Sequence, residues 1–100
     1  MTDKYILDEH GSPVPEPDLM KWAQWFETAN RHLARDVIGD VTVSTVFLGI
    51  NHRFGEGEPL LFETMVFGGP FDQEQRRYSR RIDAFAGHAD LVAQVRSTLH

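Results

Sequence analysis

The sequence predicts an α+β domain with a three- or four-stranded antiparallel sheet and two main helices, in the order (β)-α-β-β-β-α. Two segments, 43–50 and 60–69, are rich in β-branched and aromatic residues and flank a polar, glycine-containing loop. Two others, 19–29 and 80–98, place apolar residues with helical spacing. The 100 residues suit one domain with a single core. We expect an extended, proline-rich segment over 1–17 and a compact core over 18–100.

The N-terminal part combines a short strand, a connector and a helix. Residues 5–7 are predicted to form an edge strand. Pro13, Pro15 and Pro17 forbid a helix and predict an extended connector. Asp18 is a good N-cap for a helix that continues to about Asn30. Its apolar stripe, widened by Trp25, is expected to pack in the core and consists of Leu19, Trp22, Phe26 and Ala29.

The middle of the chain predicts a meander of three strands. Gly39-Asp40 separates two β-prone segments and indicates a two-residue hairpin turn with glycine at its first central position. A second hairpin centred on Phe54-Gly55 would place Phe47 opposite Phe62 and Val46 opposite Glu63. Both sheet faces would then be apolar, one with Val43, Phe47, Phe62 and Val66, the other with Leu33, Val37, Val46, Leu48, Leu61, Met65 and Phe67. If both helices cover one face, the other face predicts a homodimer or protein interface.

The C-terminal part predicts a turn, a connection and a helix. Gly68-Gly69-Pro70 ends the third strand, and residues 71–77 are expected to be a polar connection. Ser79 is predicted to cap a helix from Arg80 to about Thr98. Its apolar face includes His88, for which we expect the role of a hydrogen-bonded core residue, the alternative being a general base at a pocket.

Composition excludes several classes of site. The chain has no cysteine, which excludes disulfides, thiolate metal ligands and a cysteine nucleophile. Its five histidines form no ligand motif, so we expect no metal or cofactor. No segment has the length and apolarity of a signal peptide or membrane span, so an intracellular protein without membrane contact is expected. The net charge is −5, yet residues 76–100 hold five bases against two acids, which disfavours a nucleic-acid mimic.

Glu63 falls among apolar residues of one predicted strand face. An unpaired carboxylate is costly to bury, and Arg35 is expected nearby on the neighbouring strand. We therefore expect a structural ion pair, the alternative being a catalytic acid with a raised pKa.

Two exposed segments are candidates for binding. The first comprises Asn51, His52, Arg53 and Phe54 in the loop between the second and third strands. Anion binding there is opposed by Glu56 and Glu58 and by the lack of a phosphate-loop lysine, so a protein-recognition turn is favoured. The second comprises Arg76, Arg77, Arg80 and Arg81, which could contact an anion or a nucleic acid, although arginines at a helix start oppose the helix dipole.

Several segments together resemble a family of small proteins encoded by bacteriophages and prophages, over nearly the whole chain. They are KYILD (4–8), VPEPD (14–18), WAQWF (22–26), STVFLG (44–49), LFETMVFGG (61–69), Arg77-Tyr78-Ser79 and Ala86-Gly87-His88. The resemblance implies a phage product in the cytoplasm of a bacterial host and assigns no chemistry. Arg80-Arg81 departs from the family pattern, which has fewer bases there.

Together these features predict a non-catalytic protein that binds a host or phage protein, with inhibition of a bacterial defence system, such as an anti-CRISPR activity, as one concrete version. One alternative is an enzyme or small-ligand-binding protein that uses Glu63, His52 and His88. The other is a nucleic-acid-binding accessory protein that uses the arginines of residues 76–81.

Overall fold

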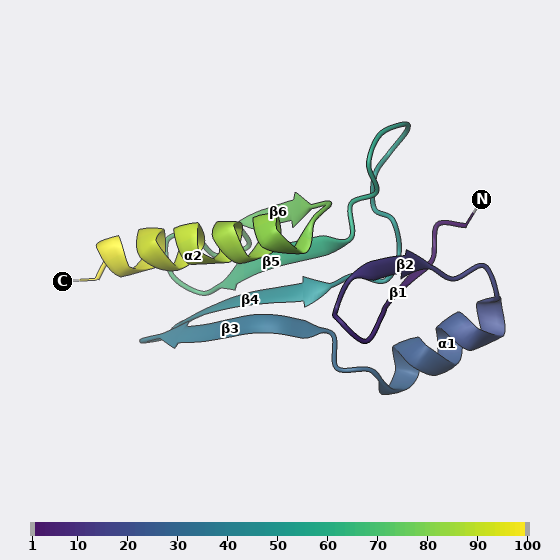
Figure 1. Cartoon of the computed structure of the whole chain (residues 1–100). Coiled ribbons are helices and arrows are strands. Elements are labelled where there is room, and N and C mark those ends of the chain that lie inside the picture. Colours follow the sequence, from purple (N-terminus) through teal and green to yellow (C-terminus); the bar gives the residue numbers. More distant parts are fainter. Residues whose placement is uncertain (1, 100) are drawn as a thin grey trace.

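A computed structural model describes residues 2–99 and has an α+β fold, as predicted (Figure 1). A four-stranded antiparallel sheet has the order β3-β4-β5-β6, and a separate hairpin pairs β1 with β2. In chain order the elements are β1 (Tyr5–Leu7), β2 (Pro13–Pro15), α1 (Leu19–Thr28), β3 (His32–Ile38), β4 (Val41–Phe47), β5 (Phe62–Phe67), β6 (Gln75–Tyr78) and α2 (Arg81–Ser97).

The two predicted hairpins of the meander are confirmed. Gly39 has a φ of 59°, the left-handed value that the first central residue of this turn requires, while Asp40 has an ordinary negative φ. In the second hairpin, Phe47 pairs with Phe62 and Val46 with Glu63. The register predicted from a hairpin centred on Phe54-Gly55 is therefore the register of the sheet.

Two proline-rich or polar segments form strands that were predicted as connections. Residues Gln75–Tyr78 are the edge strand β6, which pairs with β5 from Phe62 to Met65. Residues Pro13–Pro15 are β2, which pairs with β1. Both strands have an unpaired edge within their sheet, where proline and charged side chains are tolerated because no partner strand needs the N–H groups.

Helix α2 covers one face of the four-stranded sheet and makes the core (Figure 1). Alternate residues of β4 and β5 are fully or almost fully buried on that face, namely Val41, Val43, Thr45, Phe47, Phe62, Thr64 and Val66. The helix contributes Ala84, Leu91, Val92 and Val95. The helix begins one residue later than predicted, because Arg80 and not Ser79 is its N-cap, and the Arg80 side chain makes no capping bond.

Helix α1 lies beyond the end of the sheet, beside β1 and β2 (Figure 1). Trp22 Nε1 donates hydrogen bonds to the carbonyl oxygens of Tyr5 at 3.1 Å and Gly49 at 3.0 Å. Phe26 stacks on Trp22 with ring centroids 4.7 Å apart, and the Arg31 guanidinium lies 3.9 Å from the Phe26 centroid. The aromatic stripe of α1 therefore attaches the N-terminal hairpin to the root of the β4–β5 loop.

The second face of the sheet has neither helix over it. Val37 is 60% exposed and Phe67 is 46% exposed on this open face. The remaining side chains of this face are polar or partly shielded, namely Arg35, Thr42, Ser44, Val46, Glu63, Met65, Gln75 and Arg77. The prediction that Leu33 and Leu61 lie on this open face is wrong, because both side chains pack with the Phe47 cluster on the other face. A register shift between His32 and Ala34 turns the Leu33 side chain to the core.

The N-cap of α1 offers a direct test of the predicted helix start. Asp18 Oδ1 accepts hydrogen bonds from the backbone N–H groups of Met20 at 3.0 Å and Lys21 at 3.1 Å. We expect Asp18→Ala to lower the free energy of unfolding by about 1 kcal/mol, measured by urea denaturation. Asp18→Ser, which can still cap the helix, is the matched control and should remain within about 0.5 kcal/mol of the wild type. Equal losses in both variants would contradict the capping role.

Candidate functional site

The loop between β4 and β5 projects from the end of the sheet (Figure 1). Its root is held by the Asn51 side chain, whose Oδ1 accepts hydrogen bonds from the N–H groups of Arg53 at 2.8 Å and Leu60 at 3.0 Å. The His52 N–H also donates to the Leu60 carbonyl at 2.9 Å, and Arg53 Nε donates to the Glu58 carbonyl. These bonds close the two arms of the loop on each other.

The four predicted interaction residues divide into two roles. Asn51 and Arg53 are half-buried and bond within the loop, whereas His52 and Phe54 are exposed. Phe54 is fully exposed, at 105% of its reference area, next to Gly55 with a φ of 95°. The residues that hold the loop together thus present an aromatic side chain at its tip.

A hollow of about 230 Å³ lies beside the root of this loop. It is lined by Tyr5, Pro13, Glu58, Pro59, Leu61, Ser79 and Arg80, from the N-terminal hairpin, the loop and the start of α2. Its lining is mainly apolar, with the Arg80 guanidinium and the Glu58 carboxylate as charged groups. Sequence reasoning missed this hollow, because its residues come from four separate segments that no short motif links.

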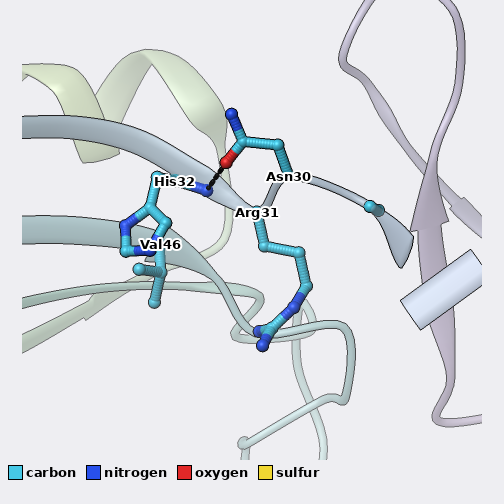
Figure 2. A pocket seen from close by; sticks show the side chains of 5 residues that line it. Asn30, Arg31, His32 and Val46 are labelled. Carbon is cyan, nitrogen blue, oxygen red and sulfur yellow. Dashed lines mark hydrogen bonds between the residues drawn. The ribbon is translucent and has the colours of Figure 1, made fainter. Parts of the chain in front are cut away.

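A second hollow, of about 300 Å³, lies where α1 leads into β3 (Figure 2). The Asn30 side chain accepts a hydrogen bond from the His32 N–H at 3.1 Å, and Arg31 Nη1 donates to the Phe47 carbonyl at 3.0 Å. In Figure 2 the Asn30 and Arg31 side chains point in opposite directions, and the His32 ring lies near Val46. These polar groups do not converge on a common point, so this hollow lacks the arrangement of a catalytic site.

Glu63, His52 and His88 do not come together. Glu63 lies on the open face, where Oε2 accepts hydrogen bonds from Gln75 Nε2 at 2.5 Å and Arg77 Nε at 3.0 Å. His88 is buried beneath α2 on the opposite face, and His52 is in the loop. The three residues therefore form no shared pocket. The partner of Glu63 is Arg77 and not Arg35, because β6 is the strand next to β5.

His88 is a hydrogen-bonded core residue, as predicted, and belongs to a buried polar chain. Its Nε2 is 2.7 Å from Asp36 Oδ2, and its Nδ1 is 2.7 Å from Thr45 Oγ1, which is 2.5 Å from Thr64 Oγ1. Both threonines are fully buried, while the Asp36 side chain is 46% exposed. A nucleophile needs access to substrate, so this hydroxyl–histidine–carboxylate series is structural. The only trace of this polar series in the sequence was a threonine at a core-facing position in each of two apolar strands, Thr45 and Thr64.

The four arginines do not form one basic surface. Arg76 and Arg77 are adjacent in β6 and therefore point to opposite faces, with Arg77 bound to Glu63. Arg81 Nη1 donates to the His10 carbonyl at 3.2 Å, across to the β1–β2 hairpin. Arg80 is 3.8 Å from Asp83, and both side chains are largely exposed. The anion or nucleic-acid site stays a prediction, and Arg77 would not share a face with Arg76 in it.

Comparisons of the chain with protein-family models, with curated proteins and with solved structures gave no match. Among residues 2–99, no three His, Asp or Glu side chains gather as metal ligands would. In the same part of the chain, neither helix is long and apolar enough to cross a membrane. Two of the exposed apolar features of the molecule are Phe54 in the β4–β5 loop and the open sheet face with Val37 and Phe67.

Proposed function

We propose that this protein is a small, non-catalytic binding protein of phage type that recognises a host or phage protein through the β4–β5 loop. The observation that carries the proposal is the fully exposed Phe54 at the tip of a loop closed by its own hydrogen bonds. Aromatic side chains dominate binding energy in protein interfaces. A loop already ordered in the free protein loses less conformational entropy on binding.

The open sheet face supports the same proposal as a secondary contact. It exposes Val37 and Phe67 on either side of Thr42, with Arg35 two residues before Val37, a mixture of apolar and polar groups typical of a modest protein interface. Inhibition of a bacterial defence system is the concrete version of the proposal that the phage-like sequence pattern favours. In that version the loop blocks a surface that the host protein needs.

The loop assignment is tested by affinity capture from a bacterial host, followed by mass spectrometry. We expect Phe54→Ala to reduce recovery of a specific host or phage protein by about tenfold or more, since removing a central aromatic anchor costs over ~1.4 kcal/mol. His52→Ala, at an exposed residue of the same loop, should give a smaller loss.

Phe67→Ala is the matched control, because it removes an exposed phenylalanine from the open sheet face instead. Its capture should fall much less than that of Phe54→Ala, because this face is only a secondary contact. If Phe54→Ala and the wild type retain identical sets of proteins, the loop is not the recognition element. Circular dichroism of each variant shows whether the fold is intact.

A further inference from the structure

We propose that the apolar hollow beside the loop root receives Phe54 from a second copy of this chain, so that two molecules form a reciprocal dimer. This inference goes beyond the proposed function, because it gives the same loop a second binding partner, another copy of the chain. The loop tip and the hollow are both exposed parts of one molecule, and one two-fold axis between them would satisfy both copies at once.

The size and lining of the hollow suit an aromatic side chain. A cavity of about 150 Å³ lined by apolar side chains is sufficient to bind benzene, and this hollow has about 230 Å³. Tyr5, Pro13, Pro59 and Leu61 supply rings and methyl groups for contact with a phenyl ring. An exposed phenylalanine and an unfilled apolar hollow both lose unfavourable contact with water when they meet.

The hollow carries one charged side chain of each sign, Arg80 and Glu58, and Arg80 is the one that suits Glu56 of an entering loop. Glu56 lies two residues after Phe54 and, within residues 2–99, forms no ion pair. Arg80 lies at the rim of the hollow, with a side chain 71% exposed and only a 3.8 Å contact to Asp83. When Phe54 enters the hollow of the partner, Glu56 of the same loop approaches Arg80 of the partner subunit. A positive group at the start of α2, unfavourable for its own helix dipole, gains a negative neighbour.

The dimer also explains why the loop is built to project. Within one molecule, the side chain at the loop tip lies away from the hollow at the root of the same loop. In a two-fold dimer, the two loops lie side by side and point in opposite directions. Each tip then lies beside the root of the other loop. The interface is small, so the dimer is expected to be weak and reversible.

Sedimentation velocity of the full chain, over about 1 μM to 1 mM, tests the proposal. We expect a concentration-dependent monomer–dimer equilibrium for the wild type. Phe54→Ala should raise the dissociation constant by about thirtyfold or more, since each dimer loses two aromatic anchors. Glu56→Arg and Arg80→Glu should each weaken the dimer, and the combined Glu56→Arg/Arg80→Glu variant should restore it. Phe67→Ala should leave the dissociation constant unchanged.

A wild type that stays monomeric up to about 1 mM overturns the proposal, and so does a dimer that Phe54→Ala and Arg80→Glu leave intact. Neither result bears on capture of a host or phage protein by the loop. Conversely, a dimer with the expected sensitivities, together with unchanged capture profiles, would support self-association and reject the proposed function. Arg80→Glu distinguishes self-association from capture of another protein, because it changes the hollow and leaves Phe54 in place.

Discussion

His88→Ala is expected to lower the free energy of unfolding by about 3 kcal/mol. The substitution removes a charge-assisted hydrogen bond to Asp36, leaves Thr45 without its imidazole partner and opens a cavity under α2. Urea denaturation monitored by tryptophan fluorescence measures the loss. Asp36→Asn is the control, and should cost about 1 kcal/mol because the Asp36 side chain is half exposed and water can solvate the groups left behind.

The direction of the hydrogen bonds from Thr64 through Thr45 and His88 to Asp36 can be tested with variants of the two threonines. In the His88 tautomer that donates from Nε2 to Asp36, the Nδ1 atom accepts from Thr45 and the Thr45 oxygen accepts from Thr64. Thr45→Val therefore orphans two buried groups, while Thr64→Val removes only one donor. We expect Thr45→Val to be the more destabilising, and the double variant to be more stable than Thr45→Val alone. Simple addition of the two losses would contradict this chain of bonds.

Gly87→Ala is expected to destabilise the protein by about 2 kcal/mol, although the same change in an exposed helix would stabilise it by about 1 kcal/mol. A Cβ at residue 87 would lie closer than 3.0 Å to Oη, Cζ and Cε1 of Tyr78, a contact that real Cβ atoms do not make. Either the Tyr78 ring or α2 must shift from the sheet. The midpoint of urea unfolding should fall with little change in slope.

Variants of Tyr78 identify the cause of that loss. Tyr78→Phe keeps the ring atoms in place and should not rescue Gly87→Ala, whereas Tyr78→Val removes them and should make Gly87→Ala neutral or stabilising in its background. By itself, Tyr78→Phe should leave stability equal or higher, because the Tyr78 hydroxyl is buried without a hydrogen-bond partner among residues 2–99. If Gly87→Ala is as stable as the wild type, Gly87 of α2 does not pack directly against the Tyr78 ring.

Local signals predicted the elements that depend on neighbouring residues. Asp18 caps α1, Gly39 makes the tight turn, and the hairpin centred on Phe54-Gly55 gave the pairing of Phe47 with Phe62. Strand β6 was missed because Gln75–Tyr78 shows one apolar residue and three polar ones, the composition of an edge strand open to water. Strand β2 was missed because its two prolines resemble a connector as much as an unpaired strand edge.

The candidate site was predictable only where it lies on one continuous segment. Asn51 to Phe54 are consecutive, and the glycines beside them indicate a loop. The hollow at the loop root and the partner of Glu63 depend on where β1, β6 and α2 meet, which periodicity does not encode. The hydrogen-bonded series Asp36, His88, Thr45 and Thr64 likewise joins β3, β4, β5 and α2. Sequence placed His88 in the core but did not identify its partners.

The attachment of the N-terminal hairpin to the loop root has a consequence for how the protein opens. The Tyr5 N–H donates to the Gly49 carbonyl, the Asn51 N–H donates to the Asp3 carbonyl, and Trp22 bridges both segments. Residues 2–28 also pack on the sheet itself, because Tyr5, Leu7 and Trp25 lie against the core cluster that contains Phe47 and Phe62. A second core cluster, which includes Val43, Val66 and Leu91, has no residue from this N-terminal unit. Partial unfolding of the N-terminal unit would therefore release the loop and uncover the Phe47 cluster, while the second cluster stays packed beneath α2. The β4–β5 loop would then have a stability of its own, lower than that of the whole fold, and a variant that weakens the Trp22 contacts is expected to disorder the loop first.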